Sequence, residues 1–227
     1  MALNIVSEID NRVAVKYVLM SVSDKTGLDS FVPALIAACP QVKILSTGGT
    51  YTAIQNILTP AQAAQNLVSV SDYTGQPEMQ GGLVKTLDFK IYLGLLSETY
   101  NDAHRNDLVR THAVAIDMVV VNLYPFKQAV AKPDVTPESA RTNIDIGGPC
   151  MVRASAKNYL RVASVTDPLD YTSLIEELKS NSGTLSLNTR FALMKKAFAH
   201  TASYDSAIAA FFTQVAPERI ASTYTLK

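Results

Sequence analysis

Hydrophobic residues recur along the chain in short unbroken runs separated by polar and amphipathic stretches. The runs typical of buried β-strands cover residues 17–22, 42–45, 67–70, 116–122 and 162–165. In the fourth run, Val119, Val120 and Val121 follow one another without a charge, as expected for a central strand that is buried on both faces. Because helical patterns alternate with these runs, the sequence predicts an α/β fold with a mostly parallel sheet flanked by helices.

Amphipathic spacing predicts the helices between the strands. One helix is expected over Leu28–Ala38 and is ended by Pro40, another opens at Thr47-Gly48-Gly49-Thr50, and a third covers 171–179. From 187 to 214 the pattern is helical without a break. We therefore expect one domain over 1–227, with an α/β body at about 17–182 and a C-terminal helical extension over 183–227. The polar run at 181–184 is the best internal boundary.

Composition narrows the classes of partner. Twenty acidic and twenty basic side chains cancel, and no basic run is available to neutralise the phosphates of a nucleic acid. A phosphate bound by this chain is therefore expected on a small molecule. Cys39 and Cys150 are too few for a disulfide framework and are interpreted as reduced thiols. No secretory leader or membrane-length apolar run is apparent, which predicts a soluble cytoplasmic protein without membrane contact.

Two loops after the first two predicted strands have the chemistry of anion binding. Ser21–Gly27 supplies hydroxyls, the Lys25 ammonium and backbone N–H groups, whereas Ser46–Thr50 supplies two glycines between hydroxyls at a helix start. Each loop alone has a structural interpretation, since Ser23 or Asp24 can cap a helix and Gly-Gly can form a tight turn. Together, at the carboxyl ends of neighbouring parallel strands, they predict one phosphate site.

Eight blocks of residues occur along the chain in a distinctive order. They are Ser21-Val22-Ser23-Asp24-Lys25-Thr26-Gly27-Leu28, Ser46-Thr47-Gly48-Gly49-Thr50, Val70-Ser71-Asp72-Tyr73-Thr74-Gly75, Pro77-Glu78-Met79, Gly82 with Val84-Lys85-Thr86-Leu87, Val121-Asn122-Leu123-Tyr124-Pro125-Phe126, Asn143-Ile144-Asp145-Ile146-Gly147-Gly148 and Arg153-Ala154-Ser155-Ala156-Lys157-Asn158. In these blocks, roughly over residues 17–205, the chain resembles the N-terminal IMP cyclohydrolase domain of the bifunctional enzyme AICAR transformylase/IMP cyclohydrolase.

The resemblance implies a methylglyoxal synthase-like fold and a reaction. The expected substrate is the formylated carboxamide ribonucleotide FAICAR, which closes its ring to inosine monophosphate (IMP) with loss of water, the last step of purine synthesis. The chain stops near the point where the family's linker into the transformylase domain begins, so a free-standing cyclohydrolase is expected. A homodimer and a separate AICAR formyltransferase are the implied partners, and no metal or redox cofactor is required.

The resemblance also assigns roles to individual residues. The phosphate cradle is expected to comprise Ser21, Ser23, Lys25, Thr47, Gly48 and Thr50. The catalytic residues are expected to be Lys85, Tyr124, Asp145 and Lys157, and the remaining substrate contacts Thr86, Asn122, Ile146 and Gly147. In this scheme Lys85 stabilises the oxyanion or protonates the departing water. Asp145 orients the carboxamide, Tyr124 relays a proton, and the N–H groups of Ile146 and Gly147 form an anion nest.

Several of these residues also have a structural interpretation. Asn122 and Tyr124 close a buried strand and can serve the core, and Asp145 can cap the helix that begins near Pro149. Lys157 poses a geometric problem, since in one straight helix it lies ~15 Å along the axis from Gly147. Cys150 is interpreted as part of a buried helix rather than as a nucleophile. The three histidines, His104, His112 and His200, lie far apart and are interpreted as surface or structural residues.

One segment departs from the family pattern. The family carries arginine before Val-Lys-Thr and a His-Pro-x-x-His-x-Gly run after it, where this chain has Leu83 and residues 88–94 beginning with Asp88. Loss of a guanidinium removes a fixed cation and five donors, which Lys90 could partly replace. This departure leaves two other functions open. One is a non-catalytic module that binds a purine nucleoside monophosphate, and the other is a methylglyoxal synthase-type lyase that acts on a triose phosphate.

Overall fold

The protein is described by a computed structural model at residues 5–76 and 86–225. Its centre is a five-stranded sheet with the order β4-β3-β2-β5-β6, and every neighbouring pair is parallel. The strands are β2 (Tyr17–Val22), β3 (Lys43–Ser46), β4 (Leu67–Ser69), β5 (Met118–Asn122) and β6 (Ala163–Val165). Each corresponds to a strand predicted from the hydrophobic runs, so the predicted α/β class with a parallel sheet is confirmed.

The register of the central strands determines which loops meet. Met20 of β2 pairs with Ser46 of β3, and Val22 of β2 pairs with Asn122 of β5. Parallel strands end at the same edge of a sheet, so the loops that leave β2, β3 and β5 emerge side by side. The sheet therefore brings together segments that lie about a hundred residues apart in the chain, such as Ser23 and Asn122 (|i−j| of 99).

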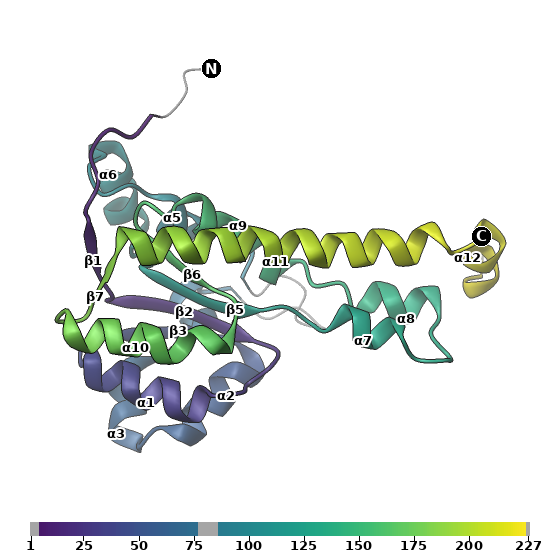
Figure 1. Ribbon diagram of the computed structural model, residues 1–227, viewed down its shortest axis with the longest axis horizontal. Helices are drawn as coiled ribbons and strands as arrows, with labels where there is room; N and C mark the ends of the chain where they lie inside the picture. The colour runs from purple at the N-terminus through teal and green to yellow at the C-terminus, as the bar shows by residue number, and fades with distance from the viewer. Residues whose placement is uncertain (1–4, 77–85, 226–227) are drawn as a thin grey trace.

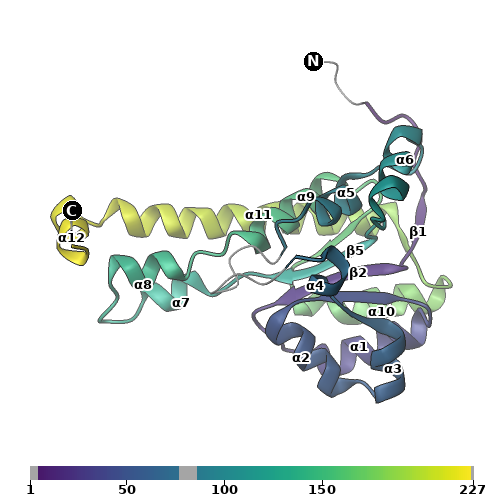
Figure 2. The same ribbon diagram turned by 180° about the vertical axis from the view of Figure 1, so that it is seen from behind.

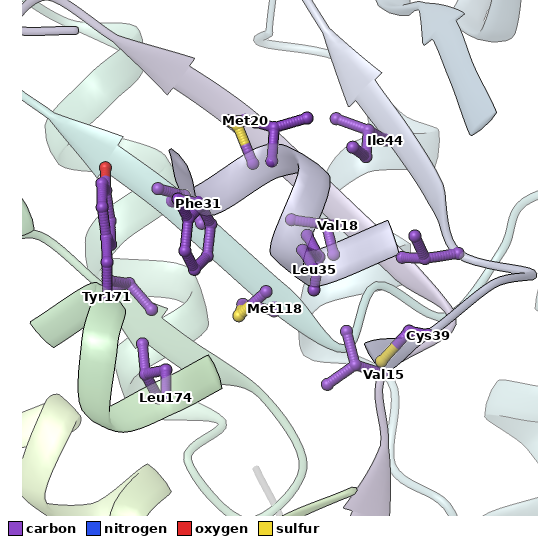
Figure 3. Packing of buried hydrophobic residues seen from close by; sticks show 14 of the residues in the cluster. Val15, Val18, Met20, Phe31, Leu35, Cys39, Ile44, Met118, Tyr171 and Leu174 are labelled. Carbon is purple, nitrogen blue, oxygen red and sulfur yellow. The ribbon is translucent and has the colours of Figure 1, made fainter. Parts of the chain in front are cut away.

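Helices cover both faces of the sheet (Figure 1). One face is covered by α1 (Leu28–Ala38), α2 (Gly48–Ile57), α3 (Pro60–Asn66) and α10 (Tyr171–Ser180), and the other by α5 (Phe89–Leu96), α9 (Gly147–Lys157) and α11 (Leu187–Thr213). In the first layer the ring of Phe31 stacks on Tyr171, with centroids 4.2 Å apart. Val18, Met20 and Met118 point into the same layer from the sheet (Figure 3).

Part of the chain extends beyond this body. The first half of α11 packs on α9 and β6, whereas its second half projects outward beside α7 (Phe126–Val130) and α8 (Pro137–Thr142), with α12 (Pro217–Thr223) at the tip (Figures 1 and 2). The remaining short elements are α4 (Val70–Thr74), α6 (Asp102–Thr111) and the 3₁₀ turn η2 (Pro168–Asp170). No helix within the described residues is long and apolar enough to cross a membrane.

The hydrophobic pattern missed a second, two-stranded sheet. β1 (Arg12–Ala14) pairs antiparallel with β7 (Thr184–Ser186), and each strand has only three residues, too few for a recognisable alternation. Of the residues at 181–184, expected as an internal boundary, 181–183 form the turn in which Ser182 and Gly183 have φ of 52° and 77°, and Thr184 begins β7. The turn thus carries the chain directly from α10 into β7 and α11.

Arg190 joins this small sheet to the body. Its side chain is only 1% exposed, and its guanidinium donates to backbone carbonyls of three separate segments. The acceptors are the carbonyl oxygens of Asp10, Asn11, Tyr159, Leu160 and Leu185. Because a guanidinium presents five donors in a fixed plane, one side chain satisfies all of these carbonyls.

A buried ion pair lies at the amino end of the sheet, opposite the edge where the loops meet. Arg161 Nη1 lies 3.2 Å from Asp117 Oδ1, and the two side chains are 7% and 9% exposed. The second oxygen of Asp117 accepts from the N–H groups of Lys16 and Tyr17, both at 2.9 Å. The pair thus fixes the starts of β2 and β5, on which the position of their carboxyl ends depends.

We expect Asp117→Asn to lower the free energy of unfolding by about 3–5 kcal/mol, because the substitution leaves the Arg161 charge buried without its counterion. Urea denaturation measures this change. Asp107→Asn is the matched control, since its partner Arg110 is 2.9 Å away in a pair with 71% and 45% of the side chains exposed. There the change should stay below about 1 kcal/mol. Equal losses in the two variants would contradict the structural role of the buried pair.

Candidate functional site

A cavity of about 410 Å³ opens where the loops after β2 and β5 meet the start of α9. Its lining includes residues from each of the loops that the sequence singled out: Ser21, Ser23, Lys25, Thr47, Gly48, Thr50, Thr86, Asn122, Tyr124, Asp145, Ile146 and Gly147. Segments separated by more than a hundred residues thus enclose one space. The two loops that were predicted to form one phosphate site therefore line the same cavity.

Asn122 holds the loop that follows β2. Its Oδ1 accepts from the N–H groups of Ser23 and Asp24 at 2.7 and 2.8 Å, and its Nδ2 donates to the carbonyl of Asp24 at 2.8 Å. The amide oxygen is therefore already engaged with the backbone. Although Asn122 lies in the cavity lining, its bonds make it a residue that shapes the β2 loop rather than one that presents a free amide to a base.

Hydroxyl groups of the second loop tie it to β2 in the same way. Thr50, which is 4% exposed, accepts from the N–H of Val22 and donates to its carbonyl, each at 3.0 Å. Ser46 Oγ donates to the Met20 carbonyl at 2.8 Å. The hydroxyls of Ser21 and Thr47 lie 3.4 Å apart across the two loops. Thr50 and Ser46 thus fix the loop geometry, and Ser21 and Thr47 are the hydroxyls that lie between the loops.

Lys25 brings positive charge to the start of α2. Among the described residues its Nζ makes only long hydrogen bonds, 3.5 Å to the Val22 carbonyl and 3.4 Å to the Ser23 carbonyl, and it lies 4.0 Å from where a Cβ on Gly49 would stand. In the described part of the chain it forms no ion pair with a carboxylate. The free N–H groups at a helix start also carry partial positive charge. An ammonium beside them repels them unless an anion lies between, so this corner is suited to a phosphate.

The opposite wall is formed by the turn that precedes α9. Asp145 Oδ1 accepts from the N–H of Gly148 at 2.9 Å, so Asp145 does bond the first turn of the helix as its capping interpretation requires. Burial raises the pKa of the Asp145 carboxyl, and hydrogen bonds from the N–H groups of Gly148 and Tyr124 offset part of that rise. A carboxylate with a raised pKa is a stronger base than a surface aspartate, and this one faces the cavity.

Both glycines of this turn are required by close packing. A Cβ on Gly148 would overlap the Asp145 carboxylate and the side chain of Leu123, and one on Gly147 would stand 2.6 Å from the Thr86 hydroxyl. The N–H groups of Ile146 and Gly147 precede the first intrahelical bonds of α9 and are therefore available to a ligand. This wall of the cavity thus combines the Asp145 carboxylate, which can accept hydrogen bonds, with the Thr86 hydroxyl and the two backbone N–H groups, which can donate them.

Not every predicted residue reaches this cavity. Lys157 lies at the C-terminal end of α9, exposed and ~15 Å along the helix axis from Gly147, since α9 is one continuous helix. The expectation that Lys157 acts in the site is therefore corrected, because its side chain cannot span that length. Lys85 lies outside the described residues. Tyr124 is 54% exposed beside the cavity, which excludes the core interpretation for it.

Lys90, considered as a partial replacement for the missing family arginine, is engaged with Tyr73 and is not part of the described cavity lining. Its Nζ donates to the Tyr73 carbonyl at 3.2 Å and lies 5.6 Å from the centroid of the Tyr73 ring. Asp88 caps α5 by accepting from the N–H of Lys90 at 2.8 Å. Asp88 therefore serves the start of α5 and the Lys90 ammonium is held by Tyr73, and neither residue belongs to the described cavity lining. In the described part of the chain, no cluster of three or more His, Cys, Asp or Glu side chains could hold a metal.

Sequence reasoning missed Tyr204, which lies in α11. Its hydroxyl accepts from the N–H of Asp145 at 2.8 Å, although the two residues are 59 positions apart. The side chain is only 8% exposed, so its aromatic character fitted the apolar face of a helix and gave no separate signal. Only the packing of α11 beside the α8–α9 loop makes the contact visible.

The MGS-like domain model matches residues 27–150, more than half of the chain. The chain belongs to the MGS-like domain family. A second model, the AICARFT/IMPCHase bienzyme, matches residues 155–227, which follow the MGS-like match in the chain. The two matches together support an IMP cyclohydrolase-type domain related to purine biosynthesis.

A solved structure supports the same architecture. The domain is similar to the crystal structure of ForH, with a TM-score of 0.71 and 28% sequence identity. The similarity covers 87% of this chain and 98% of that chain. The covered share is larger than that of the MGS-like match, so the likeness extends beyond the residues of that match.

We expect Asn122→Ala to weaken the binding of inorganic phosphate about tenfold, because the N–H groups of Ser23 and Asp24 lose their acceptor and the loop after β2 moves. Isothermal titration with inorganic phosphate measures the effect. Asn66→Ala is the matched control, since the Asn66 amide, which is 1% exposed, likewise ties another loop through the carbonyls of Pro40 and Val42 at 3.1 and 2.8 Å. If phosphate affinity is the same in the Asn122 variant and the wild type, the assigned role of Asn122 is wrong.

Proposed function

We propose that this protein is an IMP cyclohydrolase that converts FAICAR to inosine monophosphate and water. The proposal depends on one observation. A corner formed by Lys25 and Gly48 and a wall formed by Asp145 and Gly147 line the same cavity. A ribonucleotide has its phosphate at one end and its base at the other. A cavity with a cationic, amide-rich corner and a separate acid-and-amide wall matches those two ends.

The phosphate is assigned to the corner between the first two loops. There the Lys25 ammonium, the hydroxyls of Ser21, Ser23 and Thr47, and the N–H groups at the start of α2 are suited to a dianion. Thr50 and Asn122 act one step removed by holding these loops in place. This explains why polar residues whose hydrogen bonds go to the backbone still belong to the cavity wall.

The ring closure is assigned to the opposite wall. The carboxamide nitrogen attacks the formyl carbon of the same molecule, so a new C–N bond forms and the formyl oxygen takes up the electron pair. The protein holds the reactive rotamer rather than joining two reactants. Asp145 accepts a proton from the carboxamide nitrogen, and the N–H groups of Ile146 and Gly147 stabilise the developing oxyanion. That oxygen takes up two protons, one equivalent to the proton that Asp145 removed and one lost by the former formamide nitrogen. The C–O bond then breaks as a C=N bond forms in the new ring, and water leaves.

Two further residue assignments rest on the resemblance. Lys85, outside the described residues, is proposed to stabilise the oxyanion or to protonate the leaving water beside Thr86. Tyr124, exposed at the cavity mouth, is proposed as a proton relay. We also propose that the protein works as a cytoplasmic homodimer and receives FAICAR from a separate AICAR formyltransferase. The proposal assigns no role to Lys157.

We expect purified protein to convert FAICAR to IMP, seen as a rise in inosinate absorbance, and Asp145→Asn to lower kcat about a hundredfold. Because burial raises the pKa of Asp145 and the ionised form is the base, kcat should fall as the pH drops through a value above about 3.9, the ordinary aspartate pKa. In the Asp145→Asn variant this acidic limb should disappear. Tight IMP binding without turnover would replace the proposal by a nucleotide-binding module. Loss of phosphate from dihydroxyacetone phosphate would replace it by a lyase.

Lys85→Ala should slow turnover well beyond tenfold, because a cation is needed where negative charge develops on oxygen. Steady-state kinetics with FAICAR measures the change. Lys90→Ala is the control, because it removes an equal charge five residues further along the chain. The Lys90 ammonium donates to the Tyr73 carbonyl and does not belong to the described cavity lining. Wild-type turnover in the Lys85 variant would remove that lysine from the mechanism.

A further inference from the structure

The second half of α11 reaches back to the candidate site through one side chain. Tyr204 is 8% exposed, and its ring meets the ring of Phe126 edge-on, with centroids 6.3 Å apart and an interplanar angle of 71°. Phe126 in turn packs against Phe211 in the same manner, at 6.0 Å and 86°. The aromatic contacts fix the Tyr204 ring between α11 and the start of α7, so the direction of its hydroxyl is determined.

That hydroxyl makes two hydrogen bonds, and both go to the loop between α8 and α9. It accepts from the backbone N–H of Asp145 at 2.8 Å and donates to the carbonyl of Asn143 at 3.3 Å. The Asp145 carboxylate is held from the other side by the N–H of Gly148 at 2.9 Å. Asp145 is thus fixed through its backbone by α11 and through its side chain by the first turn of α9.

We propose that Tyr204 is a positioning residue that holds Asp145 in place for ring closure. This inference rests on the proposed function, since it assigns a purpose to the position of Asp145. It also gives the C-terminal helices a part in the site. The MGS-like match ends at residue 150, whereas Tyr204 lies in the segment 155–227 that matches the AICARFT/IMPCHase bienzyme. The C-terminal segment therefore completes a site whose acid belongs to the MGS-like part.

The pKa of the Asp145 carboxyl can be used to test this contact. Asp145 is faced by Tyr204 from α11 and by Tyr124 from the loop after β5, and Tyr204 lies next to Asp205 on its own helix. Burial raises the pKa of Tyr204, so its hydroxyl stays neutral and keeps both hydrogen bonds through the neutral pH range. Without the hydroxyl, the Asp145 N–H loses its acceptor and the carboxylate gains access to water. The pKa of Asp145 should then fall toward its ordinary value.

Tyr204→Phe tests the proposal, because it keeps the ring against Phe126 and removes only the hydroxyl. In the ligand-free protein, ¹³C NMR titration should show a lower pKa for the Asp145 carboxyl than in the wild type. With FAICAR, kcat should fall about ten- to hundredfold and the acidic limb of its pH profile should move to lower pH. KM should change little, since the phosphate corner at Lys25 lies on other elements.

Tyr73→Phe is the matched control. The Tyr73 hydroxyl likewise accepts one backbone N–H, from Val114 at 2.9 Å, but lies outside the cavity lining. It should leave the Asp145 pKa and kcat unchanged even if stability falls. An unchanged Asp145 pKa and kcat in Tyr204→Phe would overturn the positioning role. A shifted pKa in a protein whose wild type does not turn over FAICAR would support positioning while refuting the proposed reaction, so the two failures are distinguishable.

Discussion

The parallel alignment of β2, β3 and β5 is the constraint on which the candidate site depends. Strands that run in the same direction must release their loops at one edge, and the paired positions Val22 and Asn122 place two of those loops in contact. The Asn122 side-chain oxygen then fixes the loop after β2 by accepting hydrogen bonds from the N–H groups of Ser23 and Asp24. At the other edge, the Asp117–Arg161 pair fixes where the same strands begin.

Electrostatic asymmetry gives the cavity its two ends. The start of α2 and the Lys25 ammonium both carry positive charge, and they lie together without a carboxylate partner among the described residues. The start of α9 also supplies N–H groups, but there Asp145 already occupies one of them through Gly148. One helix start is thus left open to an anion, and the other combines donors with a base whose pKa burial has raised.

Polar residues of the cavity therefore fall into two physical roles. Some present free groups, as Lys25, Ser21 and Thr47 do at the phosphate corner. Others, including Thr50 and Asn122, form hydrogen bonds with the backbone and thereby fix the positions of the residues that carry the free groups. Tyr204 extends this second role to α11, and it connects the projecting C-terminal helix to the carboxylate at the centre of the site.

The amino-acid sequence predicts the buried runs of the central strands, the helices between them and the loops that line the cavity, because an unbroken run of valines and turns rich in glycine and hydroxyl residues are local signals. It could not place β1 beside β7, the Arg190 carbonyl cluster or the Tyr204 bond, since each joins segments far apart through contacts that leave no periodic trace. The sequence left open whether the helix that follows Gly147 ends before Lys157. Only the folded chain shows that α9 is continuous, and this continuity keeps Lys157 too far from the site to act in it.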